Sequence, residues 1–328
     1  MAADLCGRVL EGCKDHVREA EIERSSRALP SGQHGYAIVA PRYNAASVGV
    51  RCLYRLCDEL NRRGYPSYIV GSTRCGDEYA VPRVGWWQAR QWCRNGFIAV
   101  YPETVSGNPC NAATVARWAL NQPGFIGGDL IWDDRELVFI YSEVYRRTIR
   151  NQIAGKLYMP MIDESIFHCD DLDLTKRSLE CFYVGKSRWQ DGVVDRQRAF
   201  EITRRTPARH ELGKLLRASR VLYSFDNSTM LIYEALMCGC PVVVVPDGTH
   251  TREDYQALEL GMAGIAWGPE ELATVGADVA QLHRRYEQSK RDFEHQLEQF
   301  IAITQRHARG ERAISPGRDP RTARAQAA

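Results

Sequence analysis

Residues 221–245 constrain the fold of this chain more than any other segment. An apolar run that starts at Val221 ends at Asp226, an almost wholly apolar stretch follows as far as Gly239, and a run of valines begins at Val242. The two outer runs have the length and β-branched content of buried strands, and the middle one has the length of a helix. A strand, a helix and a strand joined so closely predict a parallel sheet covered by helices.

The first half of the chain repeats this arrangement. A short apolar run at 36–40 is followed by a segment with helical apolar spacing at 48–63, and Tyr65–Val70 again resembles a strand. Gly64 is suited to end the helix. Further strands are expected at Phe97–Tyr101 and Leu137–Tyr141, with a helix at Asn111–Asn121 between them. The sequence therefore predicts an α/β fold in both halves.

The domain organisation follows from length and from one proline-interrupted connection. A chain of 328 residues is long enough for about two domains. We expect a helical lead-in over 1–32, a first domain over 33–160, a second over 161–284 and a disordered tail over 308–328. Within the second half, Thr251–Leu260 and Pro269–Glu298 are expected to be helical.

Composition excludes several classes of protein. A net charge of +2 is not that of a dedicated nucleic-acid binder. The 11 cysteines are an odd number, are scattered through apolar stretches and form no C-x-x-C pair, which favours reduced thiols in the cytoplasm over disulfides or a zinc site. Residues 1–30 are too charged for a signal peptide, and no apolar run approaches the roughly 20 residues of a membrane span. We expect a cytoplasmic protein without a metal, in peripheral contact with a membrane at most.

Two carboxylates in the 221–245 segment are the candidate site. Asp226 lies where a strand ends, and ligands of open α/β sheets bind outside the carboxyl ends of strands. Glu234 lies on a helix that is apolar all round, where a carboxylate needs a partner. That partner could be an arginine or a backbone amide, which would make Glu234 structural, or it could be the diol of a bound ribose.

The segment resembles a motif of retaining glycosyltransferases. Asp226, seven intervening residues and Glu234, followed by Gly239, Cys240 and Pro241, are similar to the acidic-x7-Glu motif of the GT-B fold, group 1. The resemblance implies two Rossmann-like domains that face each other across a cleft, with the donor on the second domain and the acceptor on the first. It further implies that a C-terminal helix, 285–307, returns to the first domain.

The resemblance also assigns roles to residues of the second domain. Asp226 would lie near the donor sugar, Glu234 would bind the nucleotide ribose, and the amides of Asn227, Ser228 and Thr229 would meet the diphosphate. Lys186 and Arg188 would neutralise the diphosphate and Arg204 would assist the leaving group, although each also suits a solvated basic surface. The family usually has Glu at the first acidic position and Arg-x4-Lys as its basic pair, and both departures leave the sugar and phosphate contacts open.

The first domain offers weaker candidates. Asn44 and Ser47, in the loop after the first strand, would contact donor or acceptor, although Ser47 equally suits a helix cap. Glu103 follows a strand and would be the general base if the reaction inverts the anomeric centre. The basic segment 145–156 could meet an anionic lipid or a lipid-linked diphosphate, or could simply be solvated.

The sequence thus predicts a glycosyltransferase. It would move a sugar from a nucleoside-diphosphate sugar, its donor substrate, to a glycan or lipid-linked acceptor in cell-surface polysaccharide synthesis. Retention of configuration follows from the resemblance alone, and no metal or other cofactor is required. A nucleotide-sugar epimerase of the same fold and a non-catalytic binding subunit are the alternatives.

Overall fold

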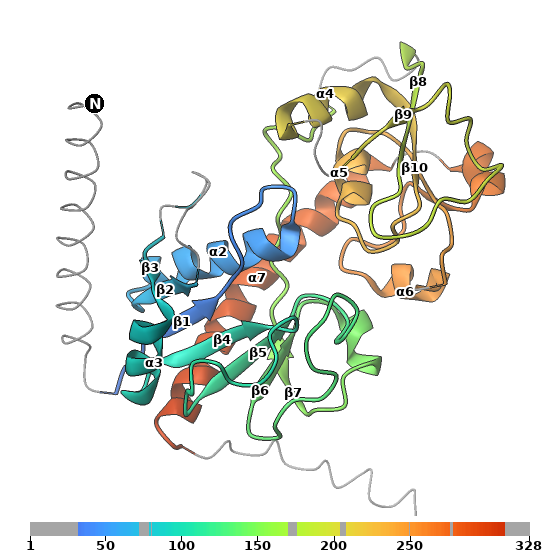
Figure 1. Cartoon of the computed structure of the whole chain (residues 1–328). Helices are drawn as coiled ribbons and strands as arrows, with labels where there is room; N and C mark the ends of the chain where they lie inside the picture. Colours follow the sequence, from blue (N-terminus) through green and yellow to red (C-terminus); the bar gives the residue numbers. More distant parts are fainter. Residues whose placement is uncertain are drawn as a thin grey trace, which may run out of the picture.

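The computed structural model describes residues 32–71, 79, 81–169, 176–203, 208–248, 250–275 and 278–311. The expected helical lead-in and nearly all of the expected tail lie outside these residues. Figure 1 shows two separate sheets joined by a connection and by a long helix.

The first sheet has seven parallel strands in the order β3-β2-β1-β4-β5-β6-β7. They are β1 (Tyr36–Val39), β2 (Ser67–Val70), β3 (Arg83–Val84), β4 (Ile98–Pro102), β5 (Val115–Ala119), β6 (Leu137–Ile140) and β7 (Ile153–Lys156). The strand order reverses between β1 and β4. Such a reversal opens a crevice at the carboxyl ends of the two strands, which is where ligands of open α/β sheets bind.

The second sheet has five parallel strands in the order β12-β11-β10-β8-β9. They are β8 (Leu179–Tyr183), β9 (Phe200–Glu201), β10 (Ser219–Ser224), β11 (Val242–Val244) and β12 (Ile265–Trp267). Here the order reverses between β8 and β10. The predicted architecture, two α/β domains each built on a parallel sheet, is confirmed.

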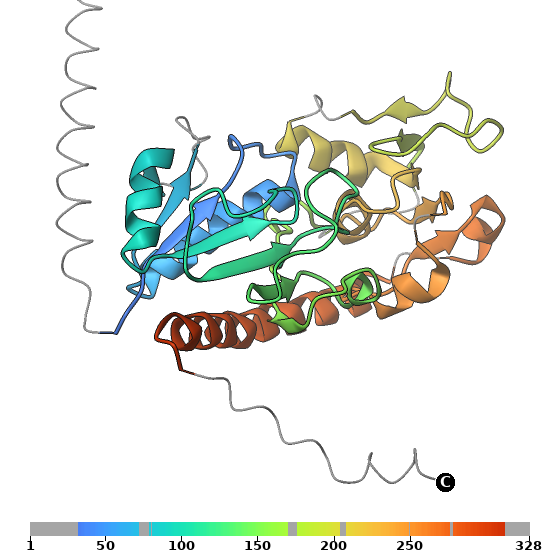
Figure 2. The same ribbon diagram turned by 60° about the horizontal axis from the view of Figure 1, so that its bottom comes forward.

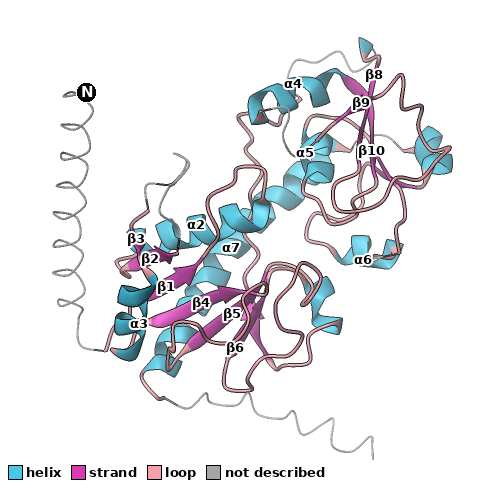
Figure 3. Cartoon of the chain, in the orientation of Figure 1, coloured by secondary structure: helices cyan, strands magenta, loops and turns pink. Residues whose placement is uncertain are grey.

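Helices cover the faces of both sheets (Figure 3). They are α2 (Val48–Arg62), α3 (Trp86–Arg94), α4 (Arg209–Ala218), α5 (Leu231–Met237), α6 (Arg252–Ala257) and α7 (Val279–Ala308), with short 3-10 turns η1 (Glu143–Arg147) and η3 (Pro269–Thr274). α2 buries Cys52, Leu53, Leu56 and Leu60 against the first sheet. Gly64 has a φ of +81° just after this helix, as expected for a helix stop. None of the helices in the described residues is both long and apolar enough to cross a membrane.

The helix α7 belongs to the cores of both domains. Its first half buries Leu282 and Tyr286 with the second core, and its second half buries Phe293, Leu297 and Phe300 with the first. The Tyr286 hydroxyl also donates to the carbonyl of Ile162, in the connection between the sheets, at 2.6 Å. Figure 2 shows this helix running beneath both domains, and it contains the expected segment 285–307.

Two of the expected helices differ from the structure. The expectation of a helix at Asn111–Asn121 is wrong, because Val115–Ala119 forms β5 in the middle of the sheet. The side chain of Arg117 on this strand is fully buried and pairs with Glu136 at 2.8 Å, so a tertiary contact overrides the local pattern. The segment expected as one helix at Pro269–Glu298 is divided, since η3 ends at Thr274 and α7 begins at Val279.

Candidate functional site

The predicted site residues follow the strands at which the two sheets reverse. Asn44 and Ser47 come after β1 and Glu103 comes directly after β4, in the first sheet. Lys186 comes after β8 and Asp226 after β10, in the second. Because all these strands are parallel within their sheet, each set lies at a carboxyl edge. The Lys186 ammonium lies 5.8 Å from the ring centroid of Phe125, so the loop at this edge of the second sheet reaches the first domain.

Asp226 holds the loop after β8. It is buried; its Oδ2 accepts a hydrogen bond from the Lys186 backbone N–H at 3.1 Å, and its Oδ1 accepts one from the Ser228 backbone N–H at 3.0 Å. Gly185 has a φ of +59°, and a Cβ there would lie 2.4 Å from Asp226 Oδ2. Only glycine therefore lets the loop pass this close to the carboxylate, and Asp226 fixes the position from which Lys186 extends.

The three residues after Asp226 shape the start of α5. The buried Asn227 side chain donates to the carbonyl of Val245 at 2.9 Å and accepts from the N–H of Asp247 at 3.3 Å, which ties the ends of β10 and β11 together. The carbonyl of Ser228 faces the Lys186 ammonium at 3.5 Å, and Thr229 Oγ1 accepts from a backbone N–H of α5 at 3.3 Å. Of the three amides predicted to meet a diphosphate, that of Ser228 is bonded to Asp226 in this state.

Glu234 is paired with an arginine. It lies on α5 with 5% of its surface exposed, and its Oε1 accepts from Arg209 Nη1, on α4, at 3.1 Å. The Arg209 guanidinium lies over the ring of Phe167 at 5.0 Å. Burial raises the pKa of Glu234, and the positive charges of Arg209 and of Arg51, from the first domain, partly offset that rise.

The two basic residues after β8 are exposed, and one of them reaches the first domain. The Lys186 ammonium lies 5.8 Å from the ring centroid of Phe125, which belongs to the connection between β5 and β6. Arg188 is exposed on the same loop. Arg204, the third predicted basic residue, lies outside the described residues.

Glu103 is a further buried carboxylate of the candidate site whose pKa is raised. Its exposed fraction is 3%, and its Oε2 accepts from the Leu120 backbone N–H at 2.9 Å. Burial raises the pKa of Glu103 to about 7, against the opposing effects of backbone hydrogen bonds and of the Lys186 charge. A carboxylate that titrates near neutral pH is suited to accept a proton as a general base.

The two predicted residues after β1 have local roles. Ser47 is the N-cap of α2, with its Oγ accepting from the Val50 N–H at 3.5 Å. Asn44 Oδ1 accepts from the Ala46 N–H at 3.0 Å, which stabilises the turn before the helix. The helix cap that the sequence allowed for Ser47 is therefore present.

Sequence reasoning missed three charged or titratable groups near these residues. Arg51 and His250 are both buried, and the field of Asp226 reaches His250. Arg209 was not among the predicted site residues, yet it pairs with Glu234. Arg51 and His250 stand alone in apolar or mixed stretches, so no local pattern marks them; only the fold brings them to the site.

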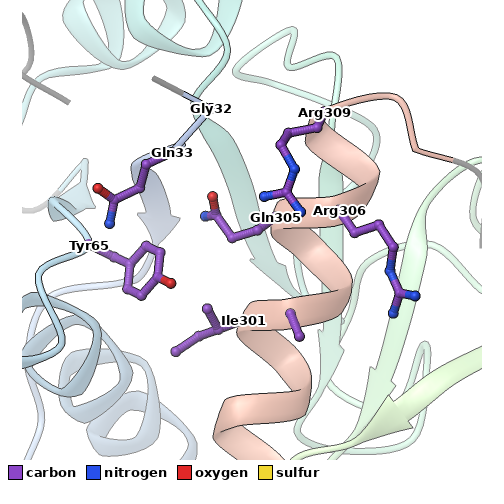
Figure 4. Close-up of a pocket in the computed structure, with 8 residues that line it drawn as sticks. Gly32, Gln33, Tyr65, Ile301, Gln305, Arg306 and Arg309 are labelled. Carbon is purple, nitrogen blue, oxygen red and sulfur yellow. The ribbon is translucent and has the colours of Figure 1, made fainter. Parts of the chain in front are cut away.

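Two hollows in the surface lie apart from all the predicted residues. The larger, about 650 Å³, is lined by Gln33, Tyr65 and the end of α7, with Ile301, Gln305, Arg306 and Arg309 among its residues (Figure 4). The smaller, about 170 Å³, lies between β7 and α7 beside Glu259. The larger has no carboxylate in its lining, so we place the candidate site by its chemistry and by the strand reversals. Within the described residues, no cluster of side chains suits a metal ion.

Comparisons with known proteins find distant structural likenesses and nothing else. No family model and no curated protein matches the chain. Among solved structures, it is similar to the glycosyltransferase SnogD from Streptomyces nogalater (11% identity, 84% of this chain and 100% of that one, TM-score 0.42). It is also similar to a glycosyltransferase of kitacinnamycin (9%, 83% and 99%, 0.46) and to an alpha-glucosyltransferase in complex with UDP and DNA (12%, 85% and 100%, 0.44). At TM-scores below 0.5 these likenesses carry no argument about this chain, whose fold rests on its own topology.

Proposed function

We propose that this chain is a glycosyltransferase that moves a sugar from a nucleoside-diphosphate sugar to an acceptor hydroxyl. One arrangement carries the proposal: Glu103 is buried at the edge of the first sheet with its pKa raised to about 7, and Lys186, which Asp226 positions at the edge of the second sheet, reaches the first domain at Phe125. A base and a cation on opposing domains suit the direct transfer of a sugar from a donor to an acceptor.

The reaction assigns a role to each group. The acceptor oxygen attacks the anomeric carbon, its proton passes to the Glu103 carboxylate, and the bond between the anomeric carbon and the diphosphate oxygen breaks. The diphosphate leaves with the electron pair of that bond, and Lys186 and Arg188 neutralise its charge, so that the step needs no metal. When the donor binds, Glu234 gives up its hydrogen bond from Arg209 and accepts hydrogen bonds from the ribose hydroxyls instead.

Two stereochemical courses are open to such a site. Direct displacement with Glu103 as base inverts the anomeric centre, whereas the motif resemblance predicts retention. We favour inversion because the pKa of Glu103 suits a base and because both Asp226 oxygens are bonded to backbone amides. The anomeric configuration of the glycoside product, read by proton NMR and compared with that of the donor, decides between the two courses.

A donor assay tests the function itself. The purified chain is incubated with a panel of nucleoside-diphosphate sugars and hydroxyl acceptors, and released nucleoside diphosphate and the sugar product are both measured. Release of the diphosphate with formation of a glycoside supports the proposal. Interconversion of the donor sugar without transfer would instead identify an epimerase, and donor binding without turnover would identify a non-catalytic subunit. The glycan or lipid-linked acceptor and the polysaccharide pathway stay proposals until such products are seen.

A further inference from the structure

The connection between β5 and β6 exposes an unusual amount of apolar surface. Phe125, Ile126, Leu130 and Ile131 lie within seven residues of one another, and between 44% and 68% of each is exposed. Single exposed hydrophobic residues are common, but a group of four large ones on one loop indicates a binding surface. We call these four residues the apolar loop.

The apolar loop is built against the proposed base. Gly128, at its centre, has a φ of +83°, and a Cβ there would lie 2.0 Å from the backbone oxygen of Glu103. Asp129 Oδ2 accepts from the Gly107 N–H at 2.7 Å, which fixes the loop to the segment that follows Glu103. The N–H of Leu120, the first residue after β5, donates to the Glu103 carboxylate itself. The connection between β5 and β6 therefore begins at the Glu103 carboxylate and later passes close to the Glu103 backbone carbonyl.

The apolar loop also reaches the second domain. The Lys186 ammonium lies 5.8 Å from the centroid of the Phe125 ring, a cation–π arrangement between the proposed base's domain and the proposed donor's domain. An acceptor whose hydroxyl meets Glu103 would consequently have apolar side chains beside it, on the same loop that faces the donor's cation.

We infer that the apolar loop is the acceptor subsite and that the acceptor is amphiphilic, with a reacting hydroxyl and an apolar hydrocarbon or aromatic body. This inference rests on the proposed function. The charge of the connection disfavours an anionic membrane as the occupant, because its own residues include Asp129, Asp133 and Asp134 against one arginine, Arg135. The Lys186 ammonium beside Phe125 comes from the second domain. The subsite holds the apolar body while Glu103 receives the hydroxyl proton, so the length of the apolar body sets the acceptor's affinity.

The test compares two acceptors that share a hydroxyl pattern and differ in apolar body. Octyl β-glucoside, below its micelle-forming concentration, and methyl β-glucoside are used with any donor that the chain turns over. We expect a KM for the octyl acceptor at least about tenfold lower, since an apolar body buried against the loop contributes in proportion to its area.

Ile126→Ser should remove most of that preference, and Ile126 is exposed enough that its replacement leaves the fold intact. Trp87→Ser is the matched control, because Trp87 on α3 is equally apolar and 74% exposed. That control should keep the full preference.

The outcomes separate this inference from the proposed function. Equal KM values for the two acceptors, or an equal loss of preference in Trp87→Ser, would overturn the subsite while leaving the transferase intact. Calorimetry of octyl β-glucoside, without donor, reports on the loop when no turnover is found. Weakened binding in Ile126→Ser alone then shows that the loop binds amphiphiles, while its role as an acceptor subsite falls with the transferase. If Ile126→Ser instead abolishes sedimentation with phosphatidylglycerol vesicles, or dissociates a dimer seen by light scattering, with the acceptor preference unchanged, the loop is a membrane or subunit contact and the inference falls.

Discussion

Replacing Glu103 by Gln should make the protein more stable at alkaline pH. An acid whose pKa is higher in the folded chain binds its proton more tightly there, so the free energy of unfolding falls as pH rises from 4.5 to about 7. The difference between about 7 and 4.5, at about 1.4 kcal/mol per tenfold change, corresponds to about 3 kcal/mol of destabilisation above neutrality. Gln carries no charge to bury and still offers an oxygen to the Leu120 N–H, so Glu103→Gln should recover a large part of this amount.

The same substitution should remove most of the activity. A base with a pKa of about 7 is charged in about 10% of molecules at pH 6 and about 90% at pH 8, so the wild-type rate should rise nearly tenfold between these values. Loss of a general base typically costs about 10²- to 10⁴-fold. Glu103→Gln should therefore be slow at both pH values and should lose the acid limb of the pH profile. Urea unfolding at pH 5 and pH 8 and initial rates at pH 6 and pH 8 measure both effects.

One control and two results decide this prediction. Glu59→Gln removes another buried carboxylate, one that pairs with Arg63 at 2.6 Å on α2, so it should lose stability at pH 8 and keep the wild-type pH profile. If Glu103→Gln destabilises the protein equally at pH 5 and pH 8, the carboxyl group is not held at a raised pKa. If the Glu103→Gln variant is stabilised but retains the wild-type rate and pH profile, the burial of Glu103 lowers the free energy of unfolding and the residue is not the base.

Three further variants test the second domain. Glu234→Gln should weaken the binding of nucleoside diphosphates by about 1–3 kcal/mol, the scale for a hydrogen bond to a charged group, and calorimetry with unchanged affinity for every nucleotide would refute the ribose role. Replacing Lys186 and Arg188 together by Ala should lower diphosphate affinity far more than nucleoside affinity, whereas equal losses for the two ligands would point to a misplaced site. Asn227→Ala should cost about 1–3 kcal/mol in the free energy of unfolding, because the Val245 carbonyl and the Asp247 N–H lose their partner; urea unfolding with no change would show that the two strand ends are held by other contacts.

The elements that the sequence predicted well are those with strong local patterns. The unit at 221–245 appears as β10, α5 and β11, and the helix expected at 48–63 appears as α2. Each has apolar residues at one period, with a polar or glycine residue at the boundary, so nearby residues are enough to specify it. The pairing of α7 with both cores could be expected from the family resemblance only, since nothing in its spacing indicates which sheet each half covers.

The errors and omissions come from partners that are distant in sequence. The segment of β5 was expected to be helical, yet Arg117 on it is buried in the sheet, where Glu136 and the carbonyls of Val105 and Gly107 accept its hydrogen bonds. The raised pKa of Glu103 was equally hidden, since it depends on the burial of the side chain in the folded chain. Sequence spacing placed Glu103 at the end of a strand, but it could not show that the strand lies beside the reversal of the sheet.

The state of Glu234 links the structural and functional interpretations that the sequence left open. An arginine partner was one of them, and Arg209 is that partner at 3.1 Å. The pairing does not exclude ribose binding, because Arg209 Nη2 is buried and makes no hydrogen bond within the described part of the chain. A buried guanidinium with an unused donor can turn towards an added acceptor at little cost. A ribose that takes the carboxylate from Arg209 would free a second cation on the second domain, where a diphosphate carries its negative charge. Glu234→Gln separates the two interpretations: a purely structural pair would change the free energy of unfolding alone, and a ribose ligand would change nucleotide affinity as well.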